Sequence, residues 1–198
     1  KSNGFNEVMN NSLTSVKDET HAVKLLNPLS TELSFMRKSL LEGLLENAIY
    51  NINRKNQDIK FFELGKIYHK KAKYEERKQL AILTSGRNYS ENWLMPKSST
   101  DFYTLKSFVN ILLGKLNLET EEVSLEDERF SDALEIVSAG KTIARLGKVS
   151  PKLLKDFDIE QECFYAEIEL ETAQQLRSKD NFKFVDIPKF NKIRRDLA

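Results

Sequence analysis

Strand-like segments come in pairs in this chain, and short polar stretches join the members of each pair. The segments 59–69 (IKFFELGKIYH) and 79–85 (QLAILTS) flank the charged stretch Lys70–Lys78, which predicts an antiparallel pair with an exposed loop. A second hairpin is predicted within 134–149, where Ala139-Gly140-Lys141 supplies the turn. Strands that pair by hairpins favour an antiparallel sheet over a parallel, doubly wound one.

The rest of the pattern supplies one more strand and several helices. Residues 164–170 alternate, with Phe, Ala, Ile and Leu on one side and Tyr, Glu and Glu on the other. Apolar residues recur at helical spacing over about 39–54 and about 101–116. Ser150-Pro151 has the form of a helix start. We therefore predict an α+β fold, an antiparallel sheet with helices packed on one side.

Two helix starts are marked by polar residues. Ser39 and Glu42 have the spacing of a capping box, in which each side chain accepts a backbone N–H of the first turn. Thr100 is the expected N-cap of the second helix. The third helix is expected to be short and to follow Ser150.

Composition excludes several classes of protein. The 31 Lys and Arg balance 30 Asp and Glu, so neither a basic nor an acidic tail dominates, and 7 Gly and 4 Pro leave no room for a linker. One cysteine and two histidines cannot assemble a zinc site or an internal disulfide, which favours a reducing compartment. No apolar run approaches the roughly 20 residues of a membrane span. The start at Lys1 lacks a Met and a signal-type stretch, so a piece of a longer protein is expected.

Catalytic candidates are few. His21 and His69 lie outside any nucleophile motif, and Cys163 precedes an alternating strand, where a buried thiol is the simpler interpretation. The glycines stand apart and form no phosphate-binding loop. We predict no catalytic, cofactor-binding or metal-binding residue in this chain.

Two basic stretches could contact phosphates. They are Lys66–Lys78, in which Tyr68 and Tyr74 are interleaved, and Lys189–Arg195. Without net basicity or a known module, an ordinary solvated surface remains the favoured reading of both.

A resemblance goes further than these patterns. Several stretches, in order, resemble the beta subunit of bacterial phenylalanyl-tRNA synthetases, in its region near the C-terminus that resembles a class II synthetase core. They are Gly4–Val8, Asn27–Leu45 (NPLSTELSFMRKSLLEGLL), Asn51–Arg54, Phe61–Tyr68 (FFELGKIY), Asn88–Trp93, Asp101–Phe108 and Phe190–Ala198 (FNKIRRDLA). The resemblance implies a catalytic-like module over 1–188. It places the start of a connection into a small C-terminal RNA-binding domain at 189–198.

The resemblance also implies that the chemistry is lost. Active class II synthetases carry a second motif with a strand ending in Phe-Arg-x-Glu, whose Arg holds the ATP alpha-phosphate. Tyr68, His69 and Lys71 stand at the Phe, Arg and Glu positions of this degenerate motif 2. A mostly neutral imidazole cannot replace a guanidinium fork on a phosphate. The glycine-rich third motif is absent from Cys163–Arg177, although Arg177 is present, and the first motif's proline is missing near Asn10.

The role that the resemblance implies is structural. We expect a non-catalytic module that supports the active site of the alpha subunit, in a cytoplasmic heterotetramer that joins phenylalanine to tRNA with ATP and magnesium. Uncovered apolar residues of the 39–54 helix and of Gly4–Val8 would meet that partner, although Leu40, Leu44 and Leu45 are also explained as core. The alternative is a tRNA-contacting module that uses Lys70, Lys73, Arg194 and Arg195.

Overall fold

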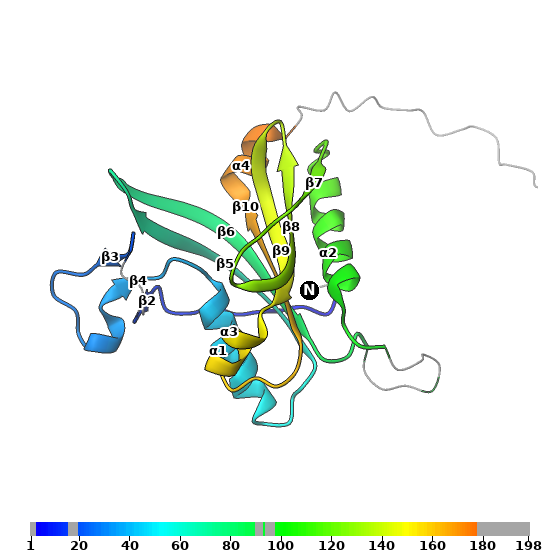
Figure 1. Cartoon of the computed structure of the whole chain (residues 1–198), viewed down its shortest axis with the longest axis horizontal. Coiled ribbons are helices and arrows are strands. Elements are labelled where there is room, and N and C mark those ends of the chain that lie inside the picture. The colour runs from blue at the N-terminus through cyan, green and yellow to red at the C-terminus, as the bar shows by residue number, and fades with distance from the viewer. Residues whose placement is uncertain (1–2, 16–19, 90–92, 94–97, 178–198) are drawn as a thin grey trace, which may run out of the picture.

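A seven-stranded sheet forms the body of the protein (Figure 1), in the strand order β1-β5-β6-β10-β9-β8-β7. The computed structural model describes residues 3–15, 20–89, 93 and 98–177. All neighbouring strands are antiparallel except β1 and β5, which are parallel. The strands are β1 (Asn6–Glu7), β5 (Ile59–Lys70), β6 (Tyr74–Ser85), β7 (Glu121–Ser124), β8 (Phe130–Ser138), β9 (Lys141–Val149) and β10 (Cys163–Glu169).

A second, three-stranded sheet lies beside the long hairpin of β5 and β6. Its strands follow the order β2-β4-β3, and they are β2 (Leu13–Thr14), β3 (Val23–Lys24) and β4 (Phe35–Met36), with a short 3-10 helix η1 (Thr31–Leu33). Backbone bonds attach this sheet to the outer edge of β5, because Tyr68 N–H donates to Arg37 and Lys70 N–H donates to His21. The small sheet therefore supports the half of the hairpin that extends away from the main sheet.

The predicted hairpins are confirmed, with one correction. The loop expected over Lys70–Lys78 is wrong, because β6 begins at Tyr74 and only residues 71–73 form the turn. Charged residues continue the strand because they pair across it, as Lys66 does with Glu76 at 2.5 Å. In the second hairpin, Ala139 (φ 48°) and Gly140 (φ 71°) both have positive φ, as the mirror-image turn of a two-residue hairpin requires.

The described part of the chain also contains four α-helices: α1 (Leu41–Ile52), α2 (Phe102–Gly114), α3 (Pro151–Asp156) and α4 (Leu170–Leu176). The α3 start is as predicted, since Ser150 accepts the N–H of Leu153. The expected Thr100 cap is wrong, and the expected capping box at Ser39 is confirmed only for the Ser39 hydroxyl. Asp101, not Thr100, caps α2 by accepting the N–H of Thr104 at 2.7 Å. The Ser39 hydroxyl accepts the N–H of Leu41, and the N-cap position of α1 falls on Leu40.

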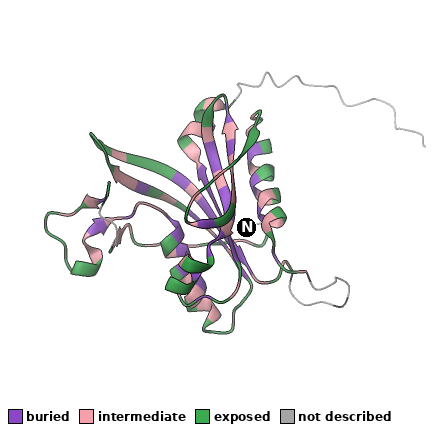
Figure 2. Ribbon diagram, viewed as in Figure 1, coloured by how far each residue is buried: buried purple, intermediate pink, exposed green. Residues whose placement is uncertain are grey.

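Helices cover both faces of the sheet, so the prediction of one covered side is wrong (Figure 2). Leu40, Leu44 and Leu45 pack with Tyr165 of β10 on the face toward α1 and α3, which we call the α1 face. Phe164 and Ile168 pack with α2 and α4 on the opposite face. The reason is the central place of β10, whose two faces must both be covered. Leu40, Leu44 and Leu45 are therefore core residues, each at most 1% exposed.

A buried ion pair joins the N-terminal segment to the sheet. Arg37 Nη1 donates to Glu63 Oε1 at 2.6 Å, and the two residues are 8% and 2% exposed. Asn10 Nδ2 donates to the other oxygen of Glu63, and Arg37 Nε donates to the carbonyl of Lys66. Gly65 leaves room for this arginine, since a Cβ there would lie 2.4 Å from Arg37 Nη2.

Candidate functional site

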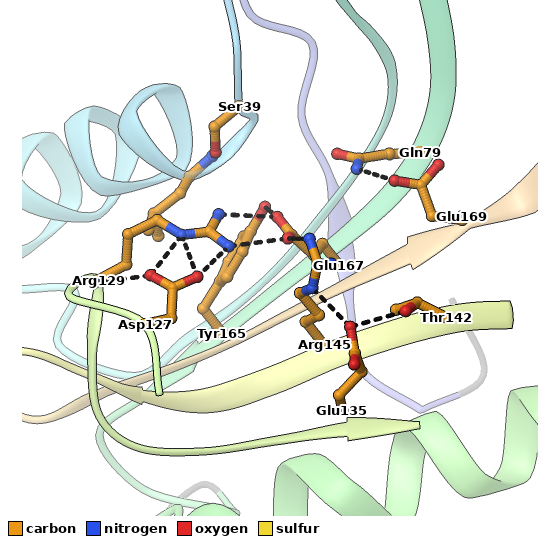
Figure 3. Close-up of polar contacts among 11 residues, drawn as sticks. Ser39, Gln79, Asp127, Arg129, Glu135, Thr142, Arg145, Tyr165, Glu167 and Glu169 are labelled. Carbon is orange, nitrogen blue, oxygen red and sulfur yellow. Dashed lines mark hydrogen bonds and ion pairs between the residues drawn. The ribbon is translucent and has the colours of Figure 1, made fainter. Parts of the chain in front are cut away.

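Charged side chains lie side by side across three strands on the α1 face. Glu135 of β8, Arg145 of β9 and Glu167 of β10 are neighbours in register. Arg145 Nε donates to Glu135 Oε1 at 3.0 Å, and its Nη1 lies 4.0 Å from Glu167 Oε1 (Figure 3). Thr142 donates its hydroxyl to the same oxygen of Glu135 at 2.8 Å. The sequence alternation places such residues opposite the apolar ones of each strand.

Arg129 completes this row from the loop before β8. Its Nη1 and Nη2 donate to the two oxygens of Glu167 at 3.1 and 3.0 Å. Its Nε and Nη2 donate to Asp127, with the shortest distance 2.8 Å. Tyr165, which is fully buried, donates its hydroxyl to Glu167 at 3.3 Å. Charges thus alternate from Asp127 through Arg129, Glu167 and Arg145 to Glu135.

The titration of these groups follows from their burial and pairing. Burial opposes the charge of Arg129, but its hydrogen bonds to Asp127 and Glu167 outweigh burial and raise its pKa. Burial would raise the pKa of Asp127, yet the hydrogen bonds and charge of Arg129 hold it below its usual value. Burial, with the nearby Glu167 charge, raises the pKa of Tyr165 well above 10.0. These groups are therefore fixed in charged pairs or kept neutral near pH 7, and none is poised to move a proton.

An open pocket of about 480 Å³ lies next to this row, between β9, β10 and the start of α4. Six charged residues line it, three basic and three acidic: Arg77, Lys141, Arg145, Glu167, Glu169 and Glu171. Glu169 also accepts a hydrogen bond from the buried amide of Gln79 at 2.6 Å. The lining charges cancel, so the pocket offers an anion no excess of positive charge.

The residues of the degenerate motif 2 lie away from this pocket. Tyr68 and His69 are half-buried on β5, opposite Glu76 and Glu75, and Lys71 is exposed in the turn, 3.7 Å from Glu75. Burial, together with the charges of Arg77 and Lys71, lowers the pKa of His69. The imidazole is therefore neutral at pH 7.

The proposed RNA-contacting residues are only partly described. Lys70 and Lys73 are exposed at the hairpin tip, and Lys70 Nζ lies 6.0 Å from the centre of the Tyr74 ring. Arg194 and Arg195, with the predicted connection 189–198, lie outside the described residues. Within the described ranges, no three acidic, His or Cys residues are grouped to hold a metal. None of the helices in those ranges is long and apolar enough to cross a membrane.

Sequence reasoning missed the polar row of the α1 face. It placed Glu167 on the other side of the strand from Phe164 but assigned it no partner, and it gave Asp127, Arg129 and Arg145 no role. One signal was available. Glutamates at alternate positions of a predicted strand indicate cationic partners on neighbouring strands, because opposite charges pair across strands.

Comparison with known proteins identifies the family. The family described as "Phenylalanyl tRNA synthetase beta chain CLM domain" matches residues 1–170. The chain belongs to this family. It is similar to the phenylalanine–tRNA ligase beta subunits of Bacteroides thetaiotaomicron (37% identical), Porphyromonas gingivalis (33%) and Listeria innocua (30%). Each match covers 98% of this chain and 26% of the relative, so the chain spans about a quarter of these proteins.

Solved structures share the fold at low sequence identity. Two structures of pyrrolysyl-tRNA synthetase from Desulfitobacterium hafniense match with TM-scores of 0.67 and 0.66, each at 15% identity. The match covers 89% of this chain and 64% of each of those chains. The likeness establishes the α+β architecture, a largely antiparallel sheet flanked by helices.

Proposed function

We propose that this chain is a non-catalytic structural module of the beta subunit of a phenylalanine–tRNA ligase, with a class II-like core. It supports the active site of the alpha subunit and the assembly of an enzyme that joins phenylalanine to its tRNA in the cytoplasm. ATP and magnesium serve the whole enzyme and are bound elsewhere. The observation that carries the proposal is the row of ion pairs on the α1 face, where Arg129 and Arg145 pair with Glu167 and Glu135 of the same chain.

The third motif of active class II synthetases is a glycine-rich run at a strand and helix near the C-terminal end, which here corresponds to β10 and α4. Glycines in such a run leave backbone open to a ligand. Glu167 and Glu169 occupy β10 instead, both on the face of Tyr165. Their side chains take up the space that glycines would leave open, and Glu167 is already paired with Arg129. This supports a core from which ATP is excluded.

The second motif points the same way. His69 stands where the phosphate-binding arginine is expected, and its lowered pKa leaves it neutral. A neutral ring offers one N–H and no charge, whereas an arginine offers a charged fork. The two degenerate motifs support the proposal separately, since His69 does not line the pocket that Glu167 and Glu169 line.

Substitution of His69 tests the proposal in the assembled enzyme. In the chain at its natural length, bound to its alpha subunit, His69→Ala is expected to leave the aminoacylation kcat and the KM for ATP within about twofold of the parent. Lys71→Ala, at the Glu position of the motif, is the matched control. A hundredfold fall in kcat with His69→Ala, and not with Lys71→Ala, would contradict a non-catalytic role.

The alternative, a tRNA-contacting module, has one observation in its favour. Lys70, Lys73 and Tyr74 are exposed together at the hairpin tip, where a cation and an aromatic ring could meet a phosphate and a base. Two other basic residues of the hairpin are already paired, Lys66 with Glu76 and Arg77 with Glu75. If the alternative holds, the double change of Lys70 and Lys73 to Gln weakens tRNA binding and lowers its salt dependence. Equal affinity of parent and variant would reject it.

A further inference from the structure

The loop between β7 and β8, residues 125–129, reaches over the α1 face and places one guanidinium between two carboxylates. Asp127 belongs to the loop itself, and Glu167 belongs to the centre of the sheet. Arg129 uses Nε and Nη2 toward Asp127, and Nη1 and Nη2 toward Glu167. The two acids therefore form a receptor that matches the planar, forked donor geometry of a guanidinium.

Backbone bonds also hold the two ends of this loop. The Leu125 N–H donates to the Ala133 carbonyl of β8, and the Arg129 carbonyl accepts the N–H of Ser150. Beneath the loop lies Tyr165, which stacks on Phe130 with ring centres 6.3 Å apart. The guanidinium is thus the part of the loop that connects it to the interior of the α1 face.

Arg145 is the other described cation beside Glu167. It lies 4.0 Å from Glu167, but its Nε already donates to Glu135. Among the described contacts, the Glu167 carboxylate, whose side chain is 7% exposed, would keep the Tyr165 hydroxyl and this longer contact with Arg145 if the Arg129 side chain were removed. A buried carboxylate left in this state is strongly unfavourable.

We propose that Asp127 and Glu167 form a binding site for a planar guanidinium-type cation, and that the chain occupies this site with its own Arg129. Arg129 is a positioning residue that acts as an internal ligand and fastens the 125–129 loop over the α1 face. The site favours a guanidinium over an ammonium group, because the planar fork of N–H donors reaches both carboxylates at once. The contacts of this site do not involve His69, and the site is present whether or not the chain is catalytic.

The test empties the site and offers a free ligand. Arg129→Ala is prepared in the chain at its natural length, and hydrogen exchange of peptides over 125–130 and 163–169 is followed by mass spectrometry. We expect at least tenfold faster exchange in the loop, and a return toward the parent rate on addition of guanidinium chloride. A small ligand held by two carboxylates is expected to saturate at about 1–20 mM, far below denaturing concentrations. Sodium chloride at the same concentration should give no protection.

Two further variants separate a ligand site from a general loss of stability. In Arg129→Ala combined with Glu167→Gln, guanidinium should no longer protect the loop, since one carboxylate is gone. Arg129→Lys keeps the charge without the fork of N–H donors, and it replaces the alanine variant if that variant does not fold. In Arg129→Lys we expect hydrogen exchange of the loop at least threefold faster than in the parent. Unchanged loop exchange in the lysine variant, or equal protection by sodium and guanidinium in the alanine variant, would overturn the proposal.

Discussion

Replacement of Gly65 by alanine tests the buried pair of Arg37 and Glu63. The added Cβ would lie 2.4 Å from Arg37 Nη2 and 2.9 Å from Leu40 Cδ2. The guanidinium must therefore retreat, which stretches its 2.6 Å contact with Glu63. Overpacking costs about 1–3 kcal/mol and breaking a buried pair about 3–5 kcal/mol. Because Arg37 can keep its bond to the Lys66 carbonyl, we expect a loss of about 3 kcal/mol in the free energy of unfolding.

Thermal unfolding followed by circular dichroism measures this loss. For a chain of this size, 3 kcal/mol corresponds to a fall in Tm of about 6–12 °C. The matched control is Gly114→Ala at the end of α2, where an added Cβ meets nothing within 4 Å, and its Tm should not fall. Arg37→Met should make the Gly65 substitution less costly, because the clashing group is gone. A Tm within about 2 °C of the parent for Gly65→Ala would refute the reasoning.

Three other groups give sharp expectations. The pKa of His69 is lowered below 6.5 in the folded chain, so the unfolded chain binds more protons at acidic pH. The free energy of unfolding is therefore maintained above pH 6.5 and falls as the pH drops through the folded pKa. Urea titrations of the parent and of His69→Gln should diverge in that pH range. Burial raises the pKa of Cys163 to about 11, so a thiol reagent at pH 8 should label it only after unfolding, and rapid labelling of the native chain would show an open core. Tyr165→Phe removes the 3.3 Å bond to Glu167 and keeps the stacking on Phe130, so it should cost about 1 kcal/mol in urea unfolding, and an unchanged midpoint would remove that bond from the account.

The local patterns predicted the elements well, because hairpins and helices depend on neighbouring residues. The Ala139-Gly140 turn and the Ser150-Pro151 start were both found where their residue types require them. The turn over Lys70–Lys78 was drawn too long, because a run of charges reads as loop although cross-strand pairs can stabilise it as strand. The predicted cap positions were off by one residue for another reason, because several polar residues compete for the first turn of a helix.

The long-range features could not be predicted in this way. The central place of β10 decides that Tyr165 and Glu167 are buried, and strand order is not encoded in any one segment. The partnership of Arg129 with Glu167 joins residues 38 positions apart across two strands. The resemblance singles out His69 as a candidate, whereas the ion pairs of Arg129 and Arg145 on the α1 face are apparent only in the three-dimensional structure.

Calorimetric titration of the chain with a non-hydrolysable phenylalanyl-adenylate analogue in magnesium buffer tests the central proposal most directly. A pocket whose lining charges cancel, and whose Glu167 is already paired with Arg129, should give no saturable heat at concentrations that saturate an active synthetase. Saturable binding of one analogue per chain would mean that the α1 face opens to an adenylate, and the chain would have to be reconsidered as a catalytic domain.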